Sequence, residues 1–288
     1  MSTSSTDPTG SEVRFVADPN SGETMVWLLN FNKILTKGMN GTLAERHDLS
    51  GIKAILDIAC GPGGWALEVA REHPDIEVTG IDISPPMIRF AAAQATARGH
   101  SNAYFNVMDA KQRLDFPDDS FDLVNERTLF GVMAPREWPS LLAECSRILR
   151  PGGIIRLTEP EVPETSSSAF NAMWSLSARA FFVTGRSFSS DGQTIGITPM
   201  LEPLLQQAGY QNVQSERHNI DISAGTEDAE GYRRNAMYAL QLTKPFLLGT
   251  KLISEAEYDE LYQRMIAEML ANDFRGTWLY LTAWGTKP

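Results

Sequence analysis

Short apolar runs alternate with segments of helical periodicity through the first half of the chain. Each run has the length of a buried strand, and each intervening segment repeats apolar residues every three or four positions. Strands are predicted at 55–58, 76–81, 103–107, 121–124 and 154–157, and helices at 65–71, 87–98 and 135–149. This alternation predicts an α/β fold with a doubly wound, mostly parallel sheet covered by helices on both faces.

A glycine-rich turn joins the first predicted strand to the first of these helices. Residues 61–64 (GPGG) let the backbone turn sharply and let a ligand lie directly against it. The turn fits the loose dinucleotide-binding pattern, but Asp57 precedes it and no Lys or Arg occurs between Lys53 and Arg71. An acidic turn disfavours the pyrophosphate of NAD. It favours a cationic ligand without phosphates, such as S-adenosylmethionine (SAM).

Two further acids stand at the ends of predicted strands. Asp82 follows the second strand, where a carboxylate accepts hydrogen bonds from both ribose hydroxyls of either SAM or NAD. Asp109 and Ala110 follow the third strand, where a carboxylate meets an adenine amino group. Both positions therefore support a nucleotide cofactor without selecting between the two classes.

Five motifs follow one another along the chain: DIACGPGG (57–64), GIDIS (80–84), MDA (108–110), FPDDSFDLV (116–124) and RILRPGG (147–153). Together they resemble the class I SAM-dependent methyltransferases, particularly small-molecule enzymes with a methyltransferase domain of the type 11/25 kind. The resemblance covers residues 50–160 well, with Ala59 where the family often has glycine. It implies a seven-stranded Rossmann-like sheet, SAM as methyl donor and S-adenosylhomocysteine (SAH) as product. The cofactor-binding residues expected are Asp57, Ala59, Gly61, Gly63, Asp82, Ile83, Met87, Asp109, Ala110, Asn125 and Glu126.

Composition divides the chain into four segments. A polar stretch predicts a disordered tail, a helical stretch predicts a lid, and the SAM-binding core follows. The last segment completes the core and carries two helical insertions that form a substrate cap. The boundaries expected are 1–20 for the tail, 21–50 for the lid, 51–160 for the core and 161–288 for the remainder, with insertions at 161–197 and 224–275. Further helices are predicted at 24–35, 43–49, 170–183, 198–208, 227–242 and 254–271, and strands at 211–222 and 276–286.

Large apolar side chains gather in the segments outside the core. In related enzymes such segments enclose the substrate, and their aromatic content favours a hydrophobic small molecule. Ordinary core packing or a dimer contact is the alternative interpretation. Arg127 either contacts SAM or substrate, or pairs with Glu126 or Glu159. The substrate-binding residues expected are Trp27, Phe31, Arg127, Phe130, Trp174 and Phe181.

No general base stands out among the titratable residues. His218, in or near the sixth strand, is a weak catalytic candidate, and a structural histidine is the more frequent case. No cluster has metal-ligand spacing, so no metal is expected. Methyl transfer from a sulfonium chiefly needs alignment and exclusion of water. It leaves open O-, N- or C-methylation, including attack by a prenyl or alkene carbon through a cationic intermediate.

Net charge and cysteine content limit the partners and the cellular location that we expect for this protein. The formal net charge of −11 disfavours nucleic acid as a partner, and the apolar stretches are too short to span a membrane. Two cysteines and a polar start favour a cytoplasmic protein. The hydrophobic substrate expected of it is a secondary metabolite. The extra helices are compatible with a homo-oligomer. A SAM-binding protein without transfer activity and an NAD-dependent oxidoreductase are the alternative functions.

Overall fold

The computed structural model describes residues 16–46, 48–227 and 229–288. Its centre is one sheet in the order β3-β2-β1-β4-β5-β8-β6, with β7 also paired to β8. Strands β1 to β5 run parallel, and β8 runs antiparallel to β5, β6 and β7. The bounds are β1 Ala54–Ile58, β2 Glu77–Asp82, β3 Ala103–Val107, β4 Phe121–Arg127, β5 Leu149–Pro160, β6 Glu164–Thr165, β7 Gln211–Asp221 and β8 Gly276–Thr286.

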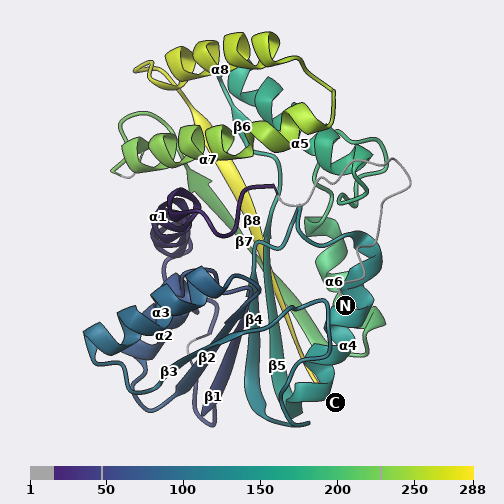
Figure 1. The fold of residues 1–288 in the computed structure, drawn as a ribbon. Helices are drawn as coiled ribbons and strands as arrows, with labels where there is room; N and C mark the ends of the chain where they lie inside the picture. Colours follow the sequence, from purple (N-terminus) through teal and green to yellow (C-terminus); the bar gives the residue numbers. More distant parts are fainter. Residues whose placement is uncertain (1–15, 47, 228) are drawn as a thin grey trace, which may run out of the picture.

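Helices cover both faces of the sheet (Figure 1). Helices α2 and α3 lie on one face, and α4 and α6 lie on the other. Because strands β1 to β5 point the same way, their carboxyl ends meet at one edge, where open α/β sheets bind ligands. The bounds are α2 Gly64–Glu72, α3 Pro85–Arg98, α4 Trp138–Ile148 and α6 Leu201–Gln207, with short 3₁₀ turns at Pro135–Glu137 and Thr198–Met200.

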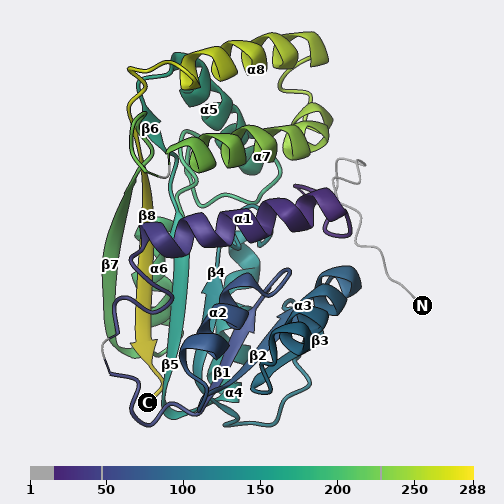
Figure 2. The same cartoon turned by 90° about the vertical axis from the view of Figure 1, so that its left-hand side faces the viewer.

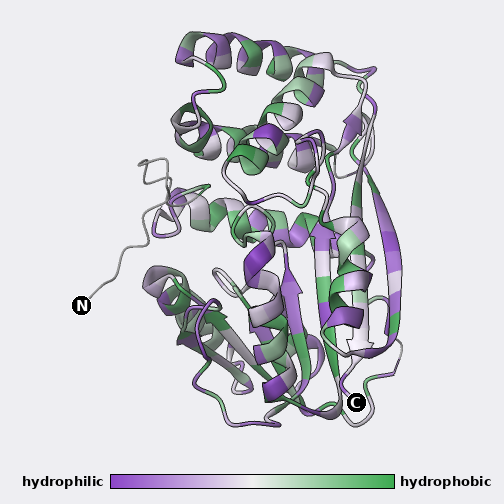
Figure 3. Ribbon diagram, turned by 90° about the vertical axis from the view of Figure 1, so that its right-hand side faces the viewer, coloured by the Kyte–Doolittle hydropathy of each residue, from purple (hydrophilic) through white to green (hydrophobic). Residues whose placement is uncertain are grey.

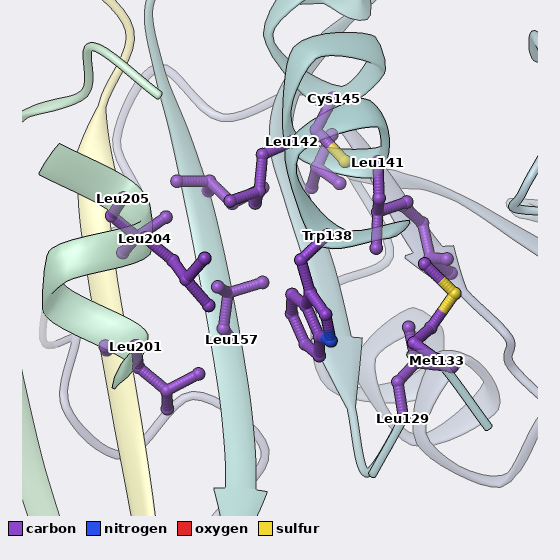
Figure 4. Packing of buried hydrophobic residues seen from close by; sticks show 14 of the residues in the cluster. Leu129, Met133, Trp138, Leu141, Leu142, Cys145, Leu157, Leu201, Leu204 and Leu205 are labelled. Atoms are coloured by element: carbon purple, nitrogen blue, oxygen red, sulfur yellow. The ribbon is translucent and has the colours of Figure 1, made fainter. Parts of the chain in front are cut away.

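The apolar faces of α4 and α6 form the main core with the sheet (Figure 4). Trp138 and the leucines of both helices surround Leu157 of β5, and all of these side chains are buried. Such close packing removes apolar surface from water and fixes the helices relative to the strands. The strand ends that carry the site therefore rest on a rigid base.

A second helical layer lies beyond the carboxyl edge of the sheet (Figure 2). It contains α5 (Ser168–Val183), α7 (Ala229–Gly249) and α8 (Glu255–Met269). Helix α1 (Gly22–Gly38) runs between this layer and the sheet, and contacts α7 on one side and α2 on the other. The space between the sheet and this helical layer is therefore bounded by elements from distant parts of the chain.

The parallel α/β architecture confirms the predicted fold class. Helix α3 begins as expected, because Ser84 Oγ accepts a hydrogen bond from the Met87 N–H and Pro85 occupies the first turn. Helix α8 begins with the predicted capping box of Ser254 and Glu257. The pattern located these helix starts because their signals are local.

One predicted element is wrong. Residues 43–46 and 48–49 lie in turns and irregular backbone rather than in a helix. Trp65 Nε1 donates to the carbonyl of Thr42 at 2.9 Å, and the Glu45 side chain is drawn into an ion pair with Arg156. These contacts with distant strands and helices override the local helical periodicity.

Other differences concern length. Strands β4 and β5 extend beyond their apolar runs, and α7 continues through Pro245 to Gly249. The two-residue strand β6 is an addition to the expected seven strands, since it forms only by pairing with β8. Strand β7 is largely hydrophilic and mostly exposed (Figure 3), as suits a strand at the edge of a sheet.

Of the predicted tail, residues 1–15 lie outside the described part of the chain. The Pro19 carbonyl accepts a hydrogen bond from Ser84 Oγ at 2.8 Å, so the chain just before α1 is attached to the core. Within the described residues, no helix combines the length and apolar character needed to cross a bilayer.

Candidate active site

The glycine turn is held in a backbone conformation that side chains resist. Gly61 and Gly63 have φ of 54° and 78°, and Gly63 caps the start of α2. A Cβ at Gly63 would lie 2.7 Å from the Cβ of Ala91, so glycine is required there on space as well as on φ. Ala59 also has a positive φ, 53°. The left-handed backbone at Ala59 is the conformation for which the glycine of related enzymes is suited.

Asp82 braces the turn from the end of β2. One carboxylate oxygen accepts from the Gly61 N–H at 2.9 Å, and the other accepts from the Ser84 N–H at 2.8 Å. Burial raises the pKa of Asp82. Each oxygen retains a lone pair, which suits a carboxylate that accepts two hydroxyl groups of one ribose.

A buried polar chain fixes Asp57 of β1. Asn125 Nδ2 donates to Asp57 at 2.8 Å, and Asn125 Oδ1 accepts from Arg156 at 2.8 Å. Arg156 in turn pairs with Glu45 at 2.5 Å, and both of these side chains are about 1% exposed. Burial raises the pKa of Asp57 to about 7, against the opposing effect of the Asn125 hydrogen bond.

One cavity of about 500 Å³ joins the glycine turn to the helical layer. At the turn it is lined by three carboxylates, those of Asp57, Asp82 and Asp109. Ile83 lies beside them and is 48% exposed although apolar, as suits a surface on which a flat ring stacks. The three carboxylates make this end of the cavity acidic, which suits a cationic ligand.

The other end of the cavity is an aromatic chamber. Its rings contact one another, with Trp174 and Trp278 centroids 4.9 Å apart and Phe130 and Phe181 centroids 5.8 Å apart. Such rings provide a large apolar surface at low cost in conformational entropy. The rings that line the chamber are Trp27, Phe31, Phe130, Trp174, Phe181, Phe246 and Trp278.

Helix α1 is attached to the helical layer across this cavity. Trp27 Nε1 donates to Asn235 Oδ1 at 3.1 Å, and Asn235 Nδ2 donates back to the Trp27 carbonyl at 3.2 Å. Trp27 also stacks on Phe31, with centroids 5.8 Å apart. This reciprocal pair of hydrogen bonds joins α1 to α7, and both residues line the chamber.

Two buried carboxyl groups hold the loop after β4. Glu126 and Glu159 both accept from the Leu129 N–H, at 2.8 and 2.7 Å, and Glu159 also accepts from the Phe130 N–H at 3.2 Å. Burial raises the pKa of both groups, that of Glu126 to about 8. The pair therefore retains a proton at neutral pH and fixes the backbone that carries Phe130 into the chamber.

Arg127 does not pair with either of these carboxyl groups. Its Nη1 donates to Thr36 Oγ1 of α1 at 3.2 Å, and no carboxylate of the described residues forms an ion pair with it. Burial lowers its pKa to about 10, so the guanidinium remains cationic at neutral pH. Arg127 thus lines the cavity as a positive charge that forms no ion pair within the described residues, although Asp57 and Glu68 attract it from a longer range.

The structure gathers most of the predicted site residues around this cavity. All six expected substrate residues line it, as do eight of the eleven expected cofactor residues. Gly63, Asn125 and Glu126 stand outside the lining, the last two fully buried in the sheet. Gly63 shapes the glycine turn, Asn125 donates a hydrogen bond to Asp57, and Glu126 accepts one from the Leu129 N–H. Each of them therefore supports a part of the cavity wall.

His218 lies outside the cavity. It is 6% exposed on β7, with Nε2 3.1 Å from Thr282 Oγ1 of β8, and burial lowers its pKa. A neutral histidine packed between strands matches the structural alternative rather than a base that contacts substrate. Its position leaves the reacting end of the cavity without a histidine among the lining residues that the structure describes.

Sequence reasoning assigned 224–275 to a substrate cap but named no lining residue of α7 or of the start of β8. Asn235, Thr243 and Phe246 of α7, Trp278 of β8 and Arg186 after α5 all line the cavity. The apolar periodicity of 227–242 indicated only a helix with a buried face. No local signal specifies that this face lies opposite α1.

Comparison with known proteins agrees with this geometry. Residues 55–153 match the family model described as a methyltransferase domain. The demethylmenaquinone methyltransferase of Lactiplantibacillus plantarum is 28% identical over 204 residues, which cover 66% of this chain and 84% of that protein. The methyltransferase pytC of Aspergillus terreus is 30% identical over 178 residues, covering 61% of this chain and 51% of that protein.

A solved structure shares the fold. It is the phosphoethanolamine N-methyltransferase 2 of Haemonchus contortus, bound to phosphomonomethylethanolamine and SAH. The TM-score is 0.55 at 20% identity, with 92% of this chain and 58% of that chain covered. The chain therefore spans little more than half the length of two of these three proteins. Residues 55–153 thus match a methyltransferase domain, and the chain shares the fold of a solved SAM-dependent methyltransferase.

Proposed function

We propose that this protein transfers a methyl group from SAM to a hydrophobic small molecule held in the aromatic chamber. The observation that carries the proposal is the division of one cavity into an acidic end at the glycine turn and an aromatic end under α1. A cationic nucleoside and an apolar acceptor fit these two ends. The arrangement brings the two together where Arg127 and Phe130 line the wall.

The residues at the acidic end fit SAM. Asp82 would hold the ribose hydroxyls, Asp109 the adenine amino group and Asp57 the cationic methionine part. A Cβ at Gly61 would meet only a methyl carbon of Leu28, at 3.4 Å, so the turn offers open space to a ligand. Bound there, SAM would supply a methyl group already activated for displacement.

The chain's own part in the transfer is alignment and exclusion of water. Trp27 and Asn235 join two helices that line the chamber, and the Glu126–Glu159 pair fixes the loop that carries Phe130. A closed, oriented site provides much of the rate enhancement of a bimolecular displacement. We propose that the transfer is an O-, N- or C-methylation that yields a secondary metabolite.

Calorimetric titration with SAM, SAH and NAD tests the cofactor. Binding of SAM and SAH without NAD is the expected result, and binding of NAD alone would overturn the proposal. Asp82→Ala should weaken SAM binding by about tenfold or more, because two hydrogen bonds to a charged acceptor are lost. Asp75→Ala, which changes an exposed acid near the same strand, is the matched control.

Transfer itself needs a separate measurement. Incubation with methyl-labelled SAM and a panel of apolar phenols, carboxylic acids, amines and prenyl compounds should give a labelled product extractable into organic solvent. SAM binding without any labelled product across that panel would favour a non-catalytic SAM-binding protein.

A further inference from the structure

The two ends of the cavity differ in the sign of their charge. All three carboxylates among its described lining residues, those of Asp57, Asp82 and Asp109, stand at the SAM end. No carboxylate among the described residues lines the rest of the cavity, whereas two guanidinium groups do, those of Arg127 and Arg186. A chamber that bound a cationic amine would be expected to offer it a carboxylate.

Arg127 is the central observation. Its guanidinium has five N–H donors, and one of these is engaged with Thr36 Oγ1 in the described part of the chain. The charge is held among apolar side chains, where an unpaired cation is costly. Burial and the nearby positive charge of Arg156 lower its pKa to about 10, and the attraction of the Asp57 and Glu68 carboxylates offsets only part of this shift.

Two further donors point to the same chemistry. Trp174 lines the chamber, and its Nε1 is buried without a hydrogen-bond partner among the described residues. Arg186 lies over the Phe246 ring, 5.7 Å from its centroid, and donates to the Gly131 carbonyl at 3.1 Å. Both groups are hydrogen-bond donors that cannot accept, as suits an anionic ligand.

We propose that the methyl acceptor is an apolar molecule carrying one anionic oxygen (a carboxylate, phenolate or enolate) and that Arg127 holds this oxygen in the chamber. The inference rests on the proposed function, since it names the acceptor of the same site. Trp174 Nε1 is placed to donate a second hydrogen bond to the acceptor.

This assignment accounts for transfer without a histidine base. A guanidinium beside an acidic hydroxyl favours the ionised form, so the proton passes to water when the acceptor binds. The anionic oxygen, or the carbon conjugated with it, then forms a bond to the methyl carbon. The carbon–sulfur bond breaks, with its electron pair passing to sulfur, and the charges of sulfonium and anion cancel.

A matched series of nine-carbon probes tests the charge preference. Binding of nonanoate, nonan-1-ol and nonylamine to the SAH-saturated protein is measured by calorimetry near pH 7.5. Nonanoate should bind at least about tenfold more tightly than nonylamine, because charge-assisted hydrogen bonds form only with the acid. Equal binding, or tighter binding of the amine, would overturn the proposal. SAH saturation is measured first, so failure to bind SAH counts against the proposed function instead.

Substitutions test whether Arg127 causes the preference for nonanoate over nonylamine. Arg127→Gln should abolish the preference for nonanoate, and Arg127→Lys should restore part of it. Arg179→Gln, on α5 and outside the cavity lining, is the matched control and should leave the preference intact. Thermal unfolding establishes that each variant is folded, and Arg186→Gln gives a second test should Arg127→Gln fail to fold. Arg186→Gln should reduce the preference without abolishing it.

Two results would oppose the assignment directly. If Arg127→Gln weakened SAH binding and left the acid preference unchanged, Arg127 would be a ligand of the cofactor's carboxylate. A second probe, 4-nitrophenol, reports ionisation by its colour. Its pKa should fall on binding to the SAH-saturated protein and should not fall with Arg127→Gln. An unchanged colour on binding to the unaltered protein would refute activation by Arg127.

Discussion

Replacing Glu126 with glutamine should make the protein more stable at neutral and alkaline pH. Glu126 and Glu159 both accept a hydrogen bond from the N–H of Leu129, in the loop after β4, and Glu126 is 0% exposed. Its pKa of about 8 in the folded protein lies well above the ordinary 4.5. The folded state therefore binds this proton more tightly than the unfolded chain does.

The magnitude follows from that difference. At about 1.4 kcal/mol for each pH step, the proton's contribution is full below pH 4.5 and falls by at most about 5 kcal/mol as the pH rises to about 8. Glutamine retains the acceptor for Leu129, and its amide can donate to Glu159 without titrating. We therefore expect Glu126→Gln to remove about one proton from the pH dependence of unfolding.

Urea unfolding at about pH 5, 6, 7 and 8 measures this directly. The free energies of unfolding of the two proteins should diverge by about 1.4 kcal/mol for each pH step, with the variant more stable at the higher pH. Glu164→Gln, an exposed change on β6, is the control and should run parallel to the unaltered protein. If the free energy of unfolding of Glu126→Gln ran parallel to that of the unaltered protein across this pH range, Glu126 would not be the group that retains the proton.

Three more predictions concern the glycine turn and the polar chain behind it. Ala59→Gly relieves a positive φ of 53°, so urea unfolding should show no loss and a gain of up to about 1 kcal/mol; a clear loss would contradict backbone strain. Arg156→Met leaves Glu45 buried without its partner and should cost about 3–5 kcal/mol in the same assay, whereas adding Glu45→Gln should recover part of that cost. Because SAM favours ionised Asp57, whose pKa is about 7, calorimetry should show SAM affinity rising about tenfold per pH step up to pH 7. Asp57→Asn should flatten the pH dependence of SAM affinity, and an unchanged slope would show that Asp57 is not the group whose ionisation SAM binding requires.

The elements that local signals specify were predicted well. The glycine turn, the Ser84 cap and the capping box of Ser254 each act within four residues, and each marks a helix start in the structure. The carboxylates at the ends of β1 and β2 line the cavity as expected, because parallel strands bring their carboxyl ends to one edge.

The features that were missed depend on partners far away in the sequence. Residues 43–46 leave the helical pattern because Glu45 pairs with Arg156. Strand β6 exists only through β8, and Asn235 enters the site only because α7 packs against α1. Periodicity identifies a buried face, but it does not identify the surface that buries it.

The hydrogen bonds between Trp27 and Asn235 have a consequence for the order of synthesis. The two residues are 208 positions apart, so α1 leaves the ribosome long before the helix that anchors it. Strand β8, which follows α7, must then insert beside β5 and supplies Trp278 to the cavity. A growing chain can assemble β1 to β5 early, yet the aromatic groups of its cavity lack the Trp278 side of their wall until β8 emerges. The cavity is therefore complete only after β8 has been synthesised and has paired with β5.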